Sequence, residues 1–418
     1  MAETDVIAKE TKERIERVGA ADIVIGLPAC GSADALHLAV EYAGAALPAI
    51  ADGLKAVVLY PDSVLPASGA ETEPANPAAA LQLVPVPWLP PDRLPSVAQK
   101  ESNAFQEVFR VSQKVAARAC CVWNSVADRI TPAAVRGLLE PILARDLDLA
   151  VARYTRPKFG GLIISSIVYP LARALYGRRI YDPMSADLGF SPRFVEILLQ
   201  PSPQTGRPRA LEWIPIQAVS AGLKICQVNL GLHPAPAQET ADLSSVLVQV
   251  LGPLFLDVER NAPLWQKARG SQSVPTFGEE VPMSEERGAG DVQRMLDTFQ
   301  LGYRNLQEIW GVVLPPATLL ELKKLTRTAP EQFRLPDDVW ARIVYDFALG
   351  HRQRAISRDH LLRAMTPLYL AWVVSYALEV RDAPAQQTND RLERLALAYE
   401  TQKPYLLSRW RWPDRFNP

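Results

Sequence analysis

The amino-acid sequence predicts an α/β protein with a Rossmann-like first half and a helical remainder. Short apolar runs with strand character alternate with helix-like patterns up to about residue 235, which is typical of an α/β sheet. Beyond that point the strand signals stop and only helical patterns follow. A length of 418 residues is comfortable for a main domain with a second module.

Six short runs rich in apolar and β-branched residues predict the strands of the first half. They are 22–27, 55–60, 81–86, 119–123, 147–153 and 224–230. Between them, residues 32–47, 103–118 and 131–143 have helical periodicity. The last of these helices opens with Thr131 at the N-cap and Pro132 at the first helical position.

The segment after the second strand is predicted to be a long irregular loop. Proline occurs 36 times in the chain, above the usual share of ~5%, and nine of these prolines fall between Pro61 and Pro95. No GxGxxG or GxxxxGK[ST] string occurs anywhere. A nucleotide would therefore have to be bound by residues other than a glycine-rich phosphate-binding loop.

The second half is predicted to consist of helices. They cover 240–261, 291–310, 316–326, 336–350, 358–380 and 389–410. Residues 268–290 are polar, with glycine, proline and serine, and predict a linker. The expected organisation is a polar helix in 1–20, an α/β domain over 21–267, this linker, and a helical domain over 291–418.

Composition indicates a soluble cytoplasmic protein. Apolar residues make up 48% and charged residues 22% of the chain, and the net charge of −1 provides no global attraction to nucleic acid or anionic lipid. The four cysteines form no CxxC pair, which favours a reducing compartment. The charged N-terminus has no signal-peptide pattern, and the most apolar stretches are interrupted before the ~20 residues of a membrane span.

Several strings together resemble one enzyme family. They are ADIVIGLP, ACCVWNSVADRITPAAVRGLLEPIL, SSIVYPLARALYGRRIYDPMSADLGFS, WQKARGSQSVPTFG and WARIVYDFALGHRQRAISRDHLLRAMTPLYL. In this order they resemble bacterial glucosylglycerate and mannosylglycerate synthase-like glycosyltransferases, from about Ala21 to Trp410. The resemblance implies a GT-A fold, a helical C-terminal extension, and transfer of a sugar from a nucleoside diphosphate donor to a small acceptor such as glycerate, with retention.

Two donor-binding positions of that family are matched in part. Its acidic residue at the end of the second strand, in an SDGG-like turn, corresponds to Asp62, although the glycines are lost. Its lysine in a GKG-like string before the next helix corresponds to Lys100, flanked here by Gln99 and Glu101. The alternative to nucleoside contact by Asp62 is a structural one, because aspartate is favoured in turns. The alternative to phosphate contact by Lys100 is that this lysine is solvated at the start of a helix.

The largest departure from the family falls on its metal site. The family ends its fourth strand in Asp-x-Asp, whose two carboxylates point the same way and hold Mg²⁺ or Mn²⁺ against the donor phosphates. This chain has Asn124, Ser125 and Val126 there, and so lacks both carboxylates. The resemblance implies a divalent metal that these residues do not favour, unless Asp128 takes over the position.

Three further family positions complete the candidate site. The resemblance assigns Asp187 and Glu212 to the pocket of the sugar and acceptor, and His233 to the family's metal-binding histidine. An unpaired carboxylate among apolar neighbours is costly, so Asp187 must be paired, capping or catalytic. Without carboxylate partners, His233 alone is a weak set of ligands for a metal ion. The alternative is that His233 is a structural or an exposed residue.

Other conspicuous residues have structural interpretations. Cys120 and Cys121 are expected to be buried strand residues. The aromatic residues of the C-terminal helices are expected in a core or at a dimer surface, and Arg409 is expected in a solvated basic tail with Arg411 and Arg415.

Two functions therefore remain. The first is a glycosyltransferase in which Asp62, Lys100, Asn124 and Val126 occupy the donor-binding positions. The second is a catalytically lapsed relative that serves as a binding or scaffold partner of an active enzyme, as a homo-oligomer or with a related chain. The degraded triplet is the feature that separates them.

Overall fold

The computed structural model describes residues 9–64, 80–88, 97–124, 130–201, 213–232, 242–283 and 290–412. The chain forms two compact units, each assembled from three separate stretches. Unit 1 consists of Met1–Tyr154, Asp182–Pro234 and Val274–Val281, and unit 2 of Thr155–Tyr181, Ala235–Ser273 and Pro282–Pro418.

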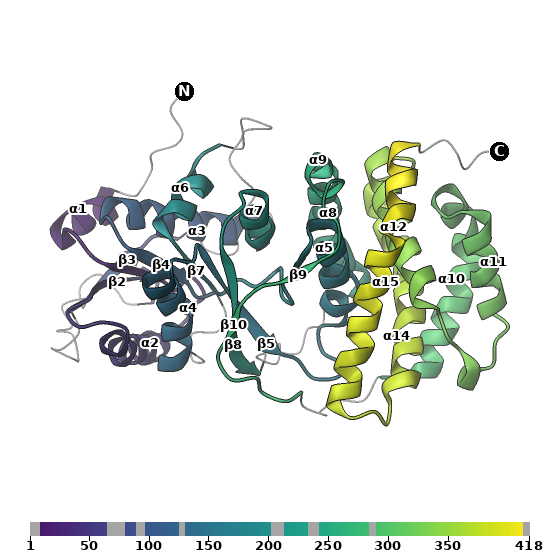
Figure 1. Cartoon of the computed structure of the whole chain (residues 1–418), viewed down its shortest axis with the longest axis horizontal. Helices are drawn as coiled ribbons and strands as arrows, with labels where there is room; N and C mark the ends of the chain where they lie inside the picture. Colours follow the sequence, from purple (N-terminus) through teal and green to yellow (C-terminus); the bar gives the residue numbers. More distant parts are fainter. Residues whose placement is uncertain are drawn as a thin grey trace. The chain divides into compact units, whose positions relative to one another are not determined.

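Unit 1 is organised around one mostly parallel sheet (Figure 1). Its strands are β1 (Ile23–Gly26), β2 (Lys55–Pro61), β3 (Ala80–Val86), β4 (Ala119–Val122), β5 (Leu149–Thr155), β7 (Leu188–Phe190), β8 (Ile225–Leu232) and β10 (Thr276–Phe277), in the order β10-β8-β5-β7-β4-β1-β2-β3. β1 pairs in parallel with β2 and β4, placing Ile25 beside Val58 and Cys121. β7 is antiparallel to both of its neighbours, β4 and β5.

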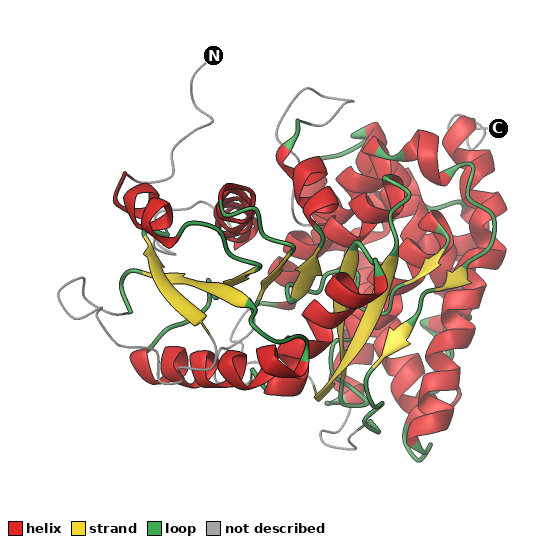
Figure 2. Ribbon diagram, turned by 60° about the vertical axis from the view of Figure 1, so that its left-hand side comes forward, coloured by secondary structure: helices red, strands yellow, loops and turns green. Residues whose placement is uncertain are grey.

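Helices cover both faces of this sheet (Figure 2). They are α1 (Lys9–Val18), α2 (Ala33–Ala46), the 3-10 turn Leu47–Ala49, α3 (Val97–Lys114), α4 (Pro132–Arg145), α6 (Pro192–Leu199) and α7 (Ile214–Ser220). α2 and α4 pack on one face, whose core includes Ile25, Val58 and Cys121. α3 and α6 pack together on the other, where the ring of Phe190 meets those of Phe109 and Phe194.

Local sequence explains where these elements begin and how closely they pack. Ser32, Thr131 and Ser191 each accept a hydrogen bond from a backbone N–H in the first turn of α2, α4 and α6. At Gly189 in β7, an added Cβ would lie 2.1 Å from the carbonyl oxygen of Leu138. A glycine is therefore required for α4 to lie against the sheet.

Unit 2 is helical. It contains the π-helical turn Ile164–Val168, α5 (Tyr169–Tyr176), α8 (Leu243–Arg260), α9 (Ala262–Trp265), α10 (Val292–Val313), α11 (Pro316–Leu325), the 3-10 turn Pro330–Gln332, α12 (Asp337–Gln353), α13 (Arg358–Ala364), α14 (Thr366–Val380) and α15 (Ala385–Arg411). The short strands β6 (Arg178–Arg179) and β9 (Gln272–Ser273) pair in parallel. The rings of Trp340, Trp372 and Tyr376 stack in its core.

Two expectations about unit 2 are corrected. Residues 358–380 form two helices instead of one, because α13 ends at Ala364 and Pro367 stands in the first turn of α14. Arg409 is not solvated: it is 8% exposed and pairs with Asp346, which is 1% exposed. Tyr405 donates its hydroxyl to the same carboxylate at 2.9 Å.

Within the part of the chain that the structure describes, one apolar stretch, Arg358–Val380, is long and apolar enough to cross a membrane by length and composition alone. Most of its apolar window, 78%, is buried. Within unit 2, α14 packs against α10, and Leu368, Trp372 and Val374 are fully enclosed. Its apolar character is thus that of a core helix.

The fold class predicted from the sequence is confirmed: an α/β unit with a parallel-dominated sheet is combined with a helical C-terminal region. All six predicted strands are present. The short strands β6, β7, β9 and β10 were not predicted, and the last two lie within the expected linker. The domain boundaries 21–267 and 291–418 stay a prediction about independent folding.

Candidate functional site

The candidate site lies at the edge of the sheet where the parallel strands end. From β1 the strand order runs through β2 to β3 on one side and to β4 on the other, so the order reverses between β1 and β4. In open α/β sheets, ligands bind outside the carboxyl ends of the strands at such a reversal. Because β7 is antiparallel, its first residues lie at this same edge.

Asp62 lies at this edge, directly after β2. Its backbone N–H donates to the carbonyl oxygen of Val86 at the end of β3, at 3.0 Å. The residue is in a turn and its side chain is exposed. The geometry therefore allows contact with a ligand, and it also fits the turn interpretation.

Lys100 is placed differently from the sequence expectation. α3 begins at Val97, six residues before the predicted start at 103, so Lys100 lies within the helix instead of before it. Its side chain is outside the described part of the structure.

Asp187 and Asn124 are brought together across the sheet. Asn124 follows β4 and Asp187 precedes β7. The Asn124 backbone N–H donates to Oδ1 of Asp187 at 2.8 Å. Asp187 is 2% exposed, and this bond gives its buried carboxylate a partner. Of the three roles expected for it, paired, capping or catalytic, the catalytic one stays a prediction.

Tyr154 is the residue of this cluster that sequence reasoning missed. It lies in β5, and its hydroxyl donates to Oδ2 of Asp187 at 2.6 Å. The strand alternation in LAVARYT indicates which face Tyr154 occupies, but its partner depends on the insertion of β7 between β4 and β5. That insertion left no signal in the sequence because β7 is three residues long.

The remaining candidate residues, Val126, Glu212 and His233, lie outside the described residues, as does Asp128. The roles expected for them stay predictions.

The cysteines of unit 1 are inert strand and core residues. Cys120 and Cys121 have no exposed surface, and burial is the main cause that raises the pKa of both thiols, to about 12 for Cys120. Thiolates are the reactive form. The structural interpretation of this pair is therefore supported.

The described residues at the end of β4 do not offer the oxygen ligands of a divalent cation. Among the described residues, no group of three or more His, Cys, Asp or Glu side chains could hold a metal ion. At the end of β4 the chain offers the neutral amide of Asn124, and both carboxylate oxygens of Asp187 accept hydrogen bonds from the protein. Mg²⁺ and Mn²⁺ require charged oxygen ligands that these two residues do not supply together.

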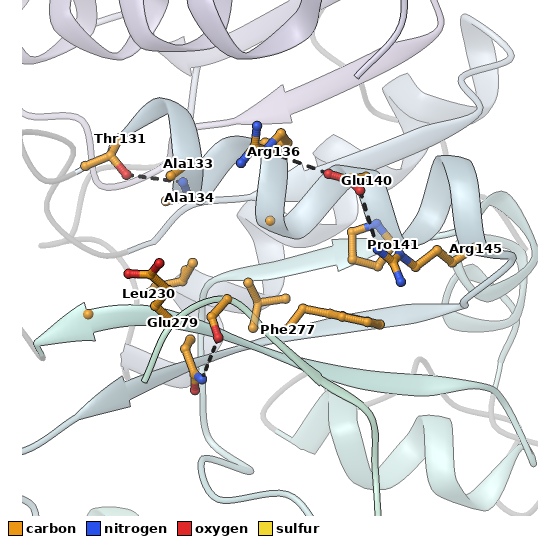
Figure 3. Close-up of a pocket in the computed structure, with 15 residues that line it drawn as sticks. Thr131, Ala133, Ala134, Arg136, Glu140, Pro141, Arg145, Leu230, Phe277 and Glu279 are labelled. Carbon is orange, nitrogen blue, oxygen red and sulfur yellow. Dashed lines mark hydrogen bonds and ion pairs between the residues drawn. The ribbon is translucent and has the colours of Figure 1, made fainter. Parts of the chain in front are cut away.

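A cavity of about 590 Å³ lies elsewhere in unit 1, between α4, β8 and the segment that carries β10 (Figure 3). Its apolar side is formed by Val228, Leu230 and Phe277. Arg136 and Arg145 lie at its polar side, and both pair with Glu140. Of the residues expected in the donor or acceptor site, the three whose side chains the structure describes, Asp62, Asn124 and Asp187, do not line this cavity.

Comparisons with known proteins give distant likenesses only. No family model and no curated protein matches the chain. Two of the similar solved structures are of glucosyl-3-phosphoglycerate synthase from Mycobacterium tuberculosis. The one with Mn²⁺, UDP and glucosyl-3-phosphoglycerate shares 16% identity over 62% of this chain and 85% of its own, with a TM-score of 0.36. The one with Mn²⁺, UDP-glucose and phosphoglyceric acid shares 17% identity over 63% of this chain and 86% of its own, with a TM-score of 0.37. A mycobacterial protein shares 19% identity over 61% of this chain and 80% of its own, with a TM-score of 0.37. At such values the likeness carries no argument about the activity of this chain.

Proposed function

We propose that this chain is a nucleotide-sugar glycosyltransferase that transfers a hexose to a small polar acceptor such as glycerate. The observation that carries the proposal is the convergence of Asp62, Asn124 and Asp187 at one edge of the sheet. These residues are distant in sequence, and the resemblance assigns each of them to one site. That edge is also where α/β sheets bind phosphorylated ligands.

In this proposal each residue acts on a different part of the donor or acceptor. Asp62 accepts hydrogen bonds from the nucleoside, and Lys100 faces the diphosphate. Asp187 and Glu212 line the pocket of the sugar and the acceptor, and His233 touches the diphosphate. Retention of configuration at the anomeric carbon is part of the same proposal.

Catalysis would then proceed without a bound metal ion. The chain offers no carboxylate pair at positions 124 and 126. Negative charge that develops on the departing diphosphate is stabilised in this proposal by the ammonium group of Lys100 and by contact with His233, since preorganised positive groups and hydrogen-bond donors can perform this task.

Ligand-induced stabilisation tests the proposal. The protein is heated with UDP-glucose, GDP-glucose or ADP-glucose, each with Mn²⁺ and with EDTA. A donor at 100 times its Kd adds about 2.7 kcal/mol of stability. We expect one donor to raise the melting temperature equally with Mn²⁺ and with EDTA, whereas no shift with any of the three contradicts the proposal.

Restoring the missing carboxylates sharpens this test. Asn124→Asp together with Val126→Asp should create Mn²⁺-dependent donor binding, and neither single change should suffice because the chelate needs both oxygens. The two single variants are the matched controls. Wild-type binding that is lost on chelation would mean that another carboxylate, such as Asp128, holds a metal.

The second candidate function is a lapsed glycosyltransferase that binds a related chain. The Asn124-Ser125-Val126 triplet favours it. Sugar transfer or donor hydrolysis by the wild-type protein without metal supports the enzyme. Donor binding that appears only in the double variant supports the lapsed relative.

A further inference from the structure

The carboxylate of Asp187 accepts hydrogen bonds from the residue Asn124, which follows β4, and from Tyr154 of β5. Its Oδ1 accepts the backbone N–H of Asn124 at 2.8 Å, and its Oδ2 accepts the hydroxyl of Tyr154 at 2.6 Å. The carboxylate thereby connects the residue after β4 to the end of β5. Hydrogen bonds to an ionised acceptor are roughly twice as strong as neutral ones.

The strand register explains why these groups meet. Leu188 lies beside Val122 on β4 and beside Val151 on β5. Asp187 precedes it, and its carbonyl oxygen accepts the N–H of Ala152 at 3.1 Å. Side chains two residues apart in a strand share a face, so Tyr154 lies on the face of Ala152 and reaches the carboxylate.

We propose that Tyr154 is a positioning residue, which fixes the carboxylate of Asp187 and, through it, the backbone at Asn124. We refer to the three hydrogen-bonded groups as the Tyr154 latch. This inference rests on the proposed function, because the position that the latch fixes is the one where the donor diphosphate is expected. Tyr154 itself needs no contact with donor or acceptor.

Loss of the Tyr154 latch should affect the backbone at Asn124 and not the rest of the sheet. Asp187 is 2% exposed, and the Trp123 N–H, next to Asn124, bonds to Gly26 on the other side of β4. Removal of the Tyr154 hydroxyl leaves these sheet bonds in place and takes one hydrogen bond away from Oδ2 of Asp187. We therefore expect loosening at Asn124 without loss of the sheet.

Amide hydrogen exchange of full-length Tyr154→Phe tests the latch independently of activity. The exchange rate of the Asn124 amide should rise about tenfold or more, while the amides of β1 and β2 keep their wild-type rates. Tyr42→Phe is the control, since Tyr42 is a half-buried tyrosine of α2 that packs on the same core. It should change neither rate.

Steady-state kinetics test the consequence for the reaction, with whichever of UDP-, GDP- or ADP-glucose stabilises the wild type. Tyr154→Phe should lower kcat about tenfold with the KM of that donor unchanged, because the hydroxyl orients a group and does not bind the donor. Unfolding would instead lower the active fraction and raise exchange throughout the sheet.

The two measurements separate the two proposals. Unchanged exchange at Asn124 in Tyr154→Phe overturns the latch, whatever the activity. Faster exchange with unchanged kcat overturns its positioning role. A wild type that binds and turns over none of the three donors overturns the proposed function, and with it the role of the latch in sugar transfer, while the exchange data still decide whether the latch exists.

Discussion

A buried histidine in unit 2 should make the protein sensitive to mild acid. His351 is 2% exposed in α12, its ring lies edge-on to Phe255, and its Nδ1 has no hydrogen-bond partner among the residues that the structure describes. Burial, together with the positive charges of Arg358 and Arg354, lowers the pKa of His351 to about 4. The ordinary value is ~6.5, so the folded protein binds fewer protons than the unfolded chain between these two values.

The sign and the size of the effect follow from this difference. Because the unfolded chain takes up the proton first, stability is lost as the pH falls below about 6.5. Between pH 7.5 and pH 5 the loss is about 2 kcal/mol for a fully shielded group, and about 1 kcal/mol after allowance for solvent screening. His351→Leu removes this titration.

Urea denaturation at pH 7.5 and pH 5, followed by tryptophan fluorescence, measures the effect. The free energy of unfolding of His351→Leu minus that of the wild type should be about 1–2 kcal/mol more positive at pH 5 than at pH 7.5, because only the wild type loses stability in acid. His360→Leu is the control, since His360 is exposed on α13, and its difference from wild type should be the same at both pH values. A difference for His351→Leu that does not vary with pH would refute the argument.

Three further predictions concern packing, charge and assembly. Gly189→Ala should destabilise unit 1 by about 3 kcal/mol, since the added Cβ meets a backbone oxygen. Gly311→Ala is the control, because it lies in open space on α10, and it should increase the free energy of unfolding by about 0.5–1 kcal/mol. Thermal denaturation that ranks the two variants otherwise would contradict the packing. Arg409→Met should cost about 3–5 kcal/mol by leaving Asp346 buried without its cation, and Asp346→Asn in the same chain should restore most of that; an additive double-mutant cycle would contradict this. Exposed leucine and valine side chains on α10 and α11 lead us to expect a homodimer, and light scattering that finds a monomer across micromolar concentrations would count against it.

Sequence patterns predicted the elements whose residues carry their own signal. The Thr131 cap followed by Pro132 placed the start of α4 within one residue. The parallel strands β1, β2 and β4 are buried apolar runs, and burial on both faces makes such runs recognisable. α3 was placed six residues late because its first turns, from Val97, are polar and weakly periodic.

The candidate site was predicted less completely for a physical reason. Asp62, Asn124 and Asp187 were found one at a time, since the resemblance matches each of them to a separate family motif. The bonds of Asp187 to Asn124 and Tyr154 span 63 and 33 residues of sequence, and no local pattern encodes them. Likewise, the burial of Arg409 could not be inferred, since its partner Asp346 is 63 residues away on another helix.

The interleaved course of the chain has a consequence for synthesis and for truncation. The chain leaves unit 1 for unit 2 after Tyr154, Pro234 and Val281, and it returns at Asp182 and Val274. When β5 has left the ribosome, the sheet still lacks β7, the strand that separates β4 from β5. β7 is synthesised only after Thr155–Tyr181, which belongs to unit 2 and packs against helices that are synthesised last. A fragment ending near residue 234 would carry an orphaned apolar helix, α5, and a fragment beginning near 282 would lack it. Each unit is complete only when stretches from distant parts of the chain have been made, so the nascent chain exposes unfinished apolar surfaces until α15 has been synthesised.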